Sequence, residues 1–179
     1  MVNRYYKMRK TIKISFILVC SLISTLTFSQ NQMDDGFKQL VNEASNKLGV
    51  SQPNMSDPVT VNAVVVWNKA KDKIAVVVKA SILYGWHIYA FVPKTAPYLK
   101  SKLVLEIPDN VIPISDWQKP ATFLMENNMY VYKGDIVFTR YFSVHRKMKG
   151  VAINTGLFYQ TCDLKQCLPP QSKTLTLSL

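Results

Sequence analysis

The chain has 179 residues, 48% of them hydrophobic and 18% charged, a balance typical of one globular domain of moderate size. Five of its 22 basic residues fall within the first 29 positions, which hold no acid, so the surplus of basic over acidic residues in the rest is six. This mild, scattered charge argues against a nucleic-acid-binding surface. We interpret the one basic cluster, residues 145–149, as a solvated turn, with a site for an anionic partner as the alternative.

Residues 1–29 predict a secretory signal peptide. Basic residues precede an apolar run over residues 14–28, and the small residue Ser29 ends the segment, as in signal peptides. Ser and Thr interrupt this run, which is shorter than the about 20 apolar residues of a membrane span. An uncleaved membrane anchor and lipidation at Cys20 stay open as alternatives. Cleavage would leave two cysteines, an even number that fits a paired state in an exported protein.

Residues 30–58 predict a helical arm and a linker. Apolar residues recur at the three- and four-residue spacing of an amphipathic helix; they are Phe37, Leu40, Val41, Ala44 and Leu48. Asp34 and Asp35 stand where acids favour the helix dipole, and we assign them no catalysis. The helix either packs on the following domain or frays as an arm. Residues 50–58 have the Pro, Ser and Asn content of a linker.

Residues 59–179 have the pattern of short strands. β-branched and aromatic runs alternate with turn signals. The runs are Val59–Trp67, Lys73–Ile82, Trp86–Phe91, Lys102–Ile107, Val111–Ile114, Tyr130–Lys133, Asp135–Val144, Val151–Tyr159 and Lys173–Leu179. With almost no helix, they predict an all-β fold, an antiparallel β-sandwich. Asn68–Asp72 predicts a turn, and Gly134 predicts a hairpin between the two runs beside it.

Cys162 and Cys167 lie five positions apart, between two predicted strands. A helix would point them to different faces. Across a short strand–loop–strand turn, facing Cβ atoms are about 4.5–5.5 Å apart, close to the about 3.5–4.5 Å of a disulfide. Pro169 and Pro170 suit the exit of such a loop, because proline stiffens the backbone and gives no donor to a sheet.

The spacing alone leaves three interpretations of this pair open: a local structural disulfide, a redox pair, or half of a metal site. Closing a loop of about six residues removes only about 2 kcal/mol of unfolded-state entropy, against about 4.7 for a loop of 100. Labile disulfides are typically exposed or strained, and a short polar loop is easy to reach. Lys165, between the cysteines, is a cation of the kind that lowers a thiol pKa.

Two motifs carry a family resemblance. Residues 159–170 read Tyr-Gln-Thr-Cys, a four-residue spacer, then Cys-Leu-Pro-Pro, and residues 85–89 read Gly-Trp-His-Ile-Tyr. Both resemble, in the same order, motifs of the N-terminal periplasmic domain of the thiol:disulfide interchange protein DsbD. The similarity runs from about Val59 to Leu179. It implies an immunoglobulin-like β-sandwich in the periplasm that exchanges thiols and disulfides.

The resemblance also implies roles and partners. Cys167 forms a mixed disulfide with a partner protein, and Cys162 resolves it. Electrons enter from a thioredoxin-like donor, with a membrane electron transporter as a transient partner, and leave to oxidised periplasmic client proteins; no cofactor is expected. We expect a separate donor protein, because the chain carries neither a membrane electron channel nor a thioredoxin-like domain. The alternatives are a secreted interaction module with a structural disulfide and a metallochaperone-like thiol site for copper or zinc.

Three further candidates for chemistry remain. His87 and His145 could join the cysteines in a zinc site, but they are 58 residues apart, whereas structural zinc sites hold their histidines about three to five apart. We interpret His87 as a hydrogen-bonded packing residue rather than a proton shuttle.

In the resembled family, a cap loop from the region of residues 117–132 covers the cysteines with an aromatic residue. Met129 or Tyr130 is the candidate here, with Glu126 as an acid near the thiols and ordinary core packing as the alternative.

Overall fold

The computed structural model describes residues 33–145 and 150–179. The predicted signal peptide and four residues of the basic cluster lie outside these ranges. The elements in chain order are α2 (Asp35–Lys47), β1 (Val59–Trp67), β2 (Lys73–Ile82), β3 (His87–Phe91), β4 (Lys102–Glu106), β5 (Val111–Pro113), β6 (Phe123–Met125), the 3₁₀ turn η1 (Glu126–Asn128), β7 (Met129–Tyr132), β8 (Asp135–Val144), β9 (Ala152–Tyr159), β10 (Thr161–Cys162) and β11 (Gln171–Ser178).

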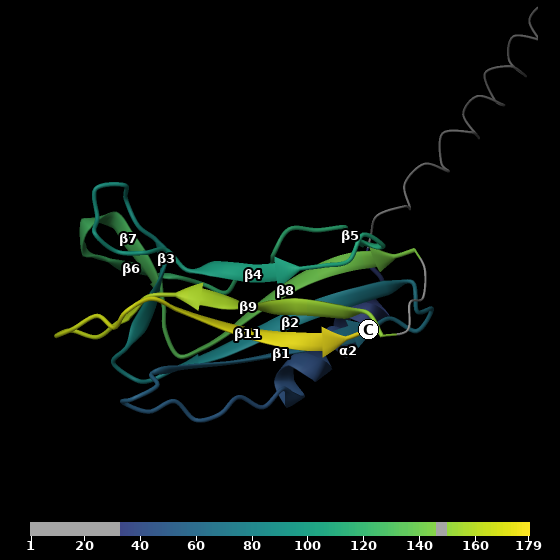
Figure 1. Ribbon diagram of the computed structural model, residues 1–179, viewed down its shortest axis with the longest axis horizontal. Coiled ribbons are helices and arrows are strands. Elements are labelled where there is room, and N and C mark those ends of the chain that lie inside the picture. Colours follow the sequence, from purple (N-terminus) through teal and green to yellow (C-terminus); the bar gives the residue numbers. More distant parts are fainter. Residues whose placement is uncertain (1–32, 146–149) are drawn as a thin grey trace, which may run out of the picture. The chain divides into compact units, whose positions relative to one another are not determined.

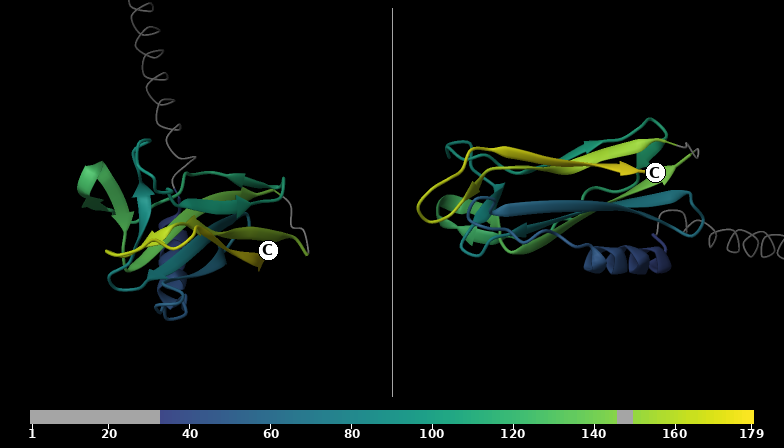
Figure 2. Two further views of the ribbon diagram at one scale, coloured as in Figure 1. Left: turned by 60° about the vertical axis from the view of Figure 1, so that its left-hand side comes forward. Right: turned by 60° about the horizontal axis from the view of Figure 1, so that its bottom comes forward.

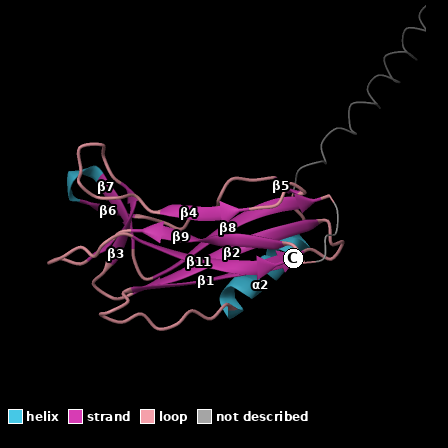
Figure 3. Ribbon diagram, in the orientation of Figure 1, coloured by secondary structure: helices cyan, strands magenta, loops and turns pink. Residues whose placement is uncertain are grey.

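The strands form three antiparallel sheets (Figure 1). Sheet A has the order β1-β2-β8-β5, sheet B has β10-β3-β7-β6, and sheet C has β11-β9-β4. Sheets A and C lie one above the other as two layers (Figure 2), and sheet B lies at one end of them. The all-β, immunoglobulin-like sandwich with one short helix before it is therefore confirmed (Figure 3).

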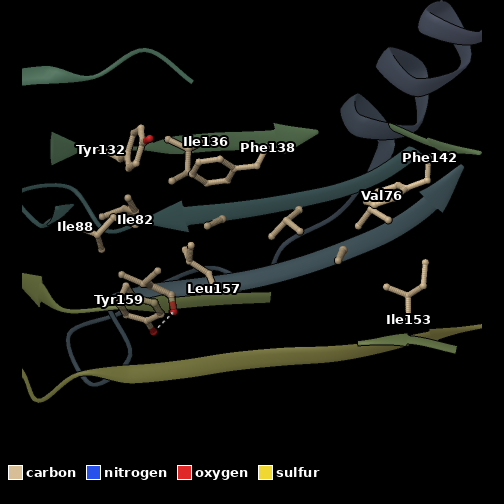
Figure 4. Packing of buried hydrophobic residues seen from close by; sticks show 14 of the residues in the cluster. Val76, Ile82, Ile88, Tyr132, Ile136, Phe138, Phe142, Ile153, Leu157 and Tyr159 are labelled. Carbon is tan, nitrogen blue, oxygen red and sulfur yellow. Dashed lines mark hydrogen bonds between the residues drawn. The ribbon is translucent and has the colours of Figure 1, made fainter. Parts of the chain in front are cut away.

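The main core lies between sheets A and C. Alternate residues of β2 point inward, as the two-residue period of a strand requires. Ile153 of β9 lies opposite Val76 and Phe142 of sheet A, and Leu157 lies further along β9 toward Tyr159 (Figure 4); all four residues Ile153, Leu157, Val76 and Phe142 are almost fully buried. We call the whole cluster of buried residues the sandwich core: Val59, Ala63, Ile74, Val76, Val78, Ala80, Ile82, Trp86, Ile88, Val111, Tyr132, Ile136, Phe138, Phe142, Val144, Ile153, Leu157 and Tyr159.

The helix packs on the outer face of sheet A rather than fraying. Phe37 and Val41 of α2 are buried, and the Phe37 ring lies edge-on to Tyr141 of β8, with ring centroids 5.7 Å apart. Tyr141 pairs with Ala75, which therefore shares this outer face. Helix α2 thus covers the outer face of β2, where Ala75 is fully buried. In the linker, the backbone carbonyl of Gly49 accepts a hydrogen bond from the Asn62 side chain.

Two details of the predicted strand pattern were wrong. The two strands beside Gly134, β7 and β8, do not form a hairpin with each other. Strand β7 pairs with β3 and β6, whereas β8 pairs with β2 and β5. Gly134, with a φ of +65°, turns the chain from sheet B into sheet A, where β8 aligns along the whole of β2. Strands β6 and β10 were also missed, since each is too short for a periodic pattern. The β1–β2 turn at Asn68–Asp72 is confirmed: the Asn68 N–H donates to the Lys73 carbonyl.

Candidate functional site

Cys162 and Cys167 form a disulfide with Cα atoms 4.0 Å apart, a bond that the spacing allowed among its three open interpretations. The two sulfur-bearing residues differ in exposure. Cys162 belongs to β10 and is only 1% exposed, whereas Cys167 is an exposed residue of the loop that follows. This loop projects at the end of the molecule that carries sheet B (Figures 1 and 2). The disulfide thus joins one exposed cysteine, Cys167, to one enclosed cysteine, Cys162.

Backbone hydrogen bonds close the loop into a tight turn. The Leu168 N–H donates to the Thr161 carbonyl at 2.9 Å. Within the loop, the Asp163 carboxylate accepts hydrogen bonds from the N–H groups of Lys165 and Gln166 at 2.7 and 2.8 Å. These bonds lower the pKa of Asp163 below its usual value, because they favour the charged form. Leu164, three residues before Cys167 in the chain, is 96% exposed on this turn.

The residues before Cys162 fasten the loop to the sheets. The buried Tyr159 hydroxyl donates to the Val59 carbonyl and lies 3.2 Å from the Gln171 side chain. The Gln160 side chain accepts a hydrogen bond from the N–H of Leu99, and the Thr161 hydroxyl donates to the carbonyl of His87. Each of the three residues before Cys162 in the Tyr-Gln-Thr-Cys motif therefore makes a hydrogen bond that holds the buried cysteine in place.

Cys162 packs in a small apolar cluster apart from the sandwich core. We call it the cysteine cluster: Tyr89, Met129, Val131 and Cys162, with Val92, Ala96, Tyr98 and Met125 packed against them. The Tyr89 hydroxyl donates to the Cys162 sulfur at 3.6 Å, and its ring stacks on Tyr98 with centroids 4.7 Å apart. Burial and the nearby Tyr98 raise the pKa of Tyr89 to about 12, so Tyr89 stays a neutral donor at neutral pH.

His87 lies directly opposite Cys162 in the pairing of β3 with β10. It is 5% exposed, and its Nε2 atom is buried with no hydrogen-bond partner among the described residues. Burial lowers the pKa of His87, Lys133 lowers it further, and Asp163 opposes them. His87 is buried, as the prediction of a packing residue requires, but the expected hydrogen bond is missing at Nε2 among the described residues. In residues 33–145 and 150–179, no three His, Cys, Asp or Glu side chains come together as a metal site, and His145 is an exposed residue.

The two candidates for a cap behave differently. Met129 is buried in the cysteine cluster, whereas Tyr130 points to the other face of β7, is exposed and meets Phe91 edge-on. Glu126 begins the η1 turn, in which Asn127 and Asn128 have φ near +57° and +55°.

Tyr98 and Ala96 belong to the cysteine cluster but were missed in the sequence, because they follow the strand-breaking Pro93 and carry no periodic signal. With Met129 they line a shallow pocket of ≈ 370 Å³.

These features define a class of protein: an all-β sandwich domain whose surface loop joins one enclosed and one open cysteine. Comparison with protein families then matches residues 55–179 to the family "Thiol:disulfide interchange protein DsbD, N-terminal". The match covers most of the chain, so the chain belongs to this family. The resemblance drawn from the two sequence motifs is confirmed.

Several solved structures resemble the chain. The N-terminal periplasmic domain of ScsB from Proteus mirabilis is 17% identical with a TM-score of 0.49, over 73% of this chain and 50% of that one. This chain therefore matches about half the length of the ScsB structure. The reduced DsbD N-terminal domain of Neisseria meningitidis is 17% identical with a TM-score of 0.44, over 75% and 92% of the two chains. A search of curated proteins finds no match.

A further resemblance is to the same Neisseria meningitidis domain in its complex with the PilB N-terminal domain. This structure is 17% identical with a TM-score of 0.38, over 65% of this chain and 80% of that one.

Proposed function

We propose that this domain exchanges thiols and disulfides with other proteins in the periplasm through Cys162 and Cys167. It takes two electrons from a thioredoxin-like donor and passes them to oxidised client proteins. The observation that carries this proposal is the contrast between the open Cys167 and the enclosed Cys162 within one disulfide. A bond with one open end suits a partner that must attack a single sulfur.

The chemistry follows from that contrast. A thiolate of the donor attacks the Cys167 sulfur, the bond to Cys162 breaks, and Cys162 leaves with the electron pair as a thiolate. A second thiol of the donor then attacks its own sulfur in the mixed disulfide, so the donor leaves oxidised and this domain is left with two thiols. In the second half-reaction the Cys167 thiolate attacks a client disulfide, and Cys162 resolves the mixed disulfide, so the client leaves reduced.

The surroundings of Cys167 suit a protein partner. Leu164, which is 96% exposed, gives the loop that carries Cys167 an exposed apolar side chain. Pro169 and Pro170 end the loop without offering a backbone donor, and Lys165 carries a positive charge at the same turn. In the part of the chain that the structure describes, no helix is long and apolar enough to cross a membrane. The periplasmic location rests on the predicted signal peptide and on the family.

The trapping experiment uses single-cysteine variants. In Cys162→Ser, the remaining Cys167 should form a mixed disulfide with a partner and hold it, because no second thiol resolves it. In the matched variant Cys167→Ser, the enclosed Cys162 should trap far less. Both proteins are incubated with a periplasmic extract and read by non-reducing gel electrophoresis. Equal trapping by both variants, or none by Cys162→Ser, contradicts the proposed function.

The rival function is an interaction module in which the disulfide only staples the loop. Thioredoxin kept reduced by dithiothreitol separates the two functions. Rapid reduction of the bond with no loss of circular dichroism supports exchange. Resistance to reduction, or unfolding upon reduction, supports the staple.

A further inference from the structure

A buried imidazole beside the enclosed cysteine has no task in the scheme above. His87 pairs directly with Cys162 across β3 and β10, and side chains of directly opposed residues share a face, with Cβ atoms about 4.5–5.5 Å apart. The Nε2 atom of His87 is buried without a hydrogen-bond partner in the described part of the chain. An unpaired buried polar atom is costly, so a protein rarely keeps one without use.

Cys162 has the complementary need. At 1% exposure, in a cluster of Tyr, Met and Val side chains, its thiol has little access to water. Apolar burial raises the pKa of a thiol, so the reduced Cys162 does not ionise readily by itself. It must nevertheless lose its proton to act as a nucleophile, because the thiolate is the attacking species.

We propose that the His87 imidazole accepts the proton of the Cys162 thiol while Cys162 attacks the mixed disulfide on Cys167. The inference rests on the proposed function and assigns a proton acceptor to its resolving step. The Cys162 sulfur bonds to the Cys167 sulfur, and the bond between Cys167 and the partner breaks. The partner's sulfur leaves with the electron pair, and the proton stays on His87 until water or the departing thiolate removes it.

The charges around His87 fit a neutral acceptor. Lys133 faces it from the turn after β7 and Asp163 from the turn after β10, while Tyr89 of β3 meets its ring edge-on with centroids 5.2 Å apart. Burial and Lys133 lower the pKa of His87 and outweigh Asp163. The ring is therefore uncharged at neutral pH, with a lone pair available. The Tyr89 hydroxyl, 3.6 Å from the Cys162 sulfur, can stabilise the thiolate as it forms.

A small aromatic disulfide, dithiobis(nitrobenzoate), isolates the step. One equivalent added to the reduced protein releases a first coloured thiolate when Cys167 attacks, and a second when Cys162 resolves the mixed disulfide. The leaving thiolate takes no proton at neutral pH, so in the second phase the proton of Cys162 is the only one that moves. Stopped-flow absorbance follows both phases in the wild type, in His87→Gln, which keeps a polar side chain that does not titrate, and in His145→Gln as the matched histidine control.

We expect His87→Gln to slow the second phase at pH 7 by about tenfold or more, within the range of general-base catalysis, and to leave the first phase unchanged. The gap should close at alkaline pH, where the thiol ionises without help. In acid, the wild-type second phase should fall as the imidazole is protonated, and the variant should lack this limb. His145→Gln should match the wild type in both phases.

The outcomes separate the two proposals. A wild type that releases no second thiolate overturns the proposed function itself. A wild-type second phase that His87→Gln leaves unchanged, or slows equally at every pH, overturns only the role of His87. If His87→Gln does not fold, the wild-type profile decides: its acid limb must share its midpoint with the His87 imidazole titrated by NMR, and a different midpoint overturns the inference.

Discussion

The sandwich core and the cysteine cluster are both apolar and buried, yet they differ in kind. The sandwich core consists largely of Val, Ile, Leu and Phe side chains, and the hydroxyl of its Tyr159 has hydrogen-bond partners. The cysteine cluster is smaller and holds a sulfur and a tyrosine hydroxyl; beside it lies an imidazole nitrogen that has no hydrogen-bond partner within residues 33–145 and 150–179. One region holds the sheets together, and the other encloses one end of a bond that has to react.

The largest effect is expected in the sandwich core. Phe142→Ala removes a fully buried ring and should lower the free energy of unfolding by about 3–5 kcal/mol, measured by chemical denaturation. The rate at which dithiothreitol reduces the disulfide of the folded protein should not change, because Cys167 is already exposed. A reduction rate that rises in proportion to the destabilisation would show that the disulfide is reached only through global unfolding. The cysteine cluster would then not differ from the sandwich core in this respect.

A change in the cysteine cluster should reverse this pattern. Met129→Ala removes a side chain packed with Cys162 and should cost about 2–3 kcal/mol, at the low end for buried methionine. It should also speed reduction of the disulfide several-fold, because it opens the Cys162 sulfur, the enclosed end of the bond, to attack in addition to the already exposed Cys167. Tyr130→Ala is the matched control, since Tyr130 directly follows Met129, is the other cap candidate and points to the opposite, exposed face of β7. Equal rates for Met129→Ala and the wild type would mean that Met129 shields nothing.

The same comparison explains what the sequence could predict. The spacing of Cys162 and Cys167 allows the disulfide, because the geometry is local, but does not separate it from half of a metal site. The strand period predicts the inward face of β2. The partner of β8 was missed, because Gly134 signals a turn equally well before a hairpin or a change of sheet. The open Nε2 of His87 was missed for a similar reason: hydrogen bonding of a buried atom depends on strands distant in sequence, and no local pattern encodes it.

Tyr159 links the two regions. Its ring belongs to the sandwich core, while its hydroxyl joins the start of β1 to the exit of the cysteine loop through Val59 and Gln171. Tyr159→Phe should therefore reduce the free energy of unfolding, measured by chemical denaturation, by about 0.5–1.5 kcal/mol, the net contribution of a hydrogen bond. The loss is no larger because the Val59 carbonyl still accepts a hydrogen bond from the Lys173 ammonium. Tyr84→Phe, at a fully exposed tyrosine, should change nothing. Equal free energies of unfolding for Tyr159→Phe and Tyr84→Phe would show that the Tyr159 hydroxyl does not connect the two regions.

The smallest effect is expected at the loop's own turn. The pKa of Asp163 is lowered by the N–H groups of Lys165 and Gln166, so its contribution to the turn is complete above the unfolded pKa of about 3.9. That contribution is lost as the pH falls through the lower folded value.

The variant Asp163→Asn keeps an acceptor oxygen but does not titrate. With a phosphine as the reductant, we therefore compare the rate at which the wild-type disulfide is reduced with the rate in Asp163→Asn. The ratio of the wild-type rate to the variant rate should be a few-fold higher below pH of about 4 than at pH 7. The ratio of the two rates is the measurement, because any effect of acid on the phosphine cancels, and a ratio constant with pH would show that the carboxylate does not hold the turn.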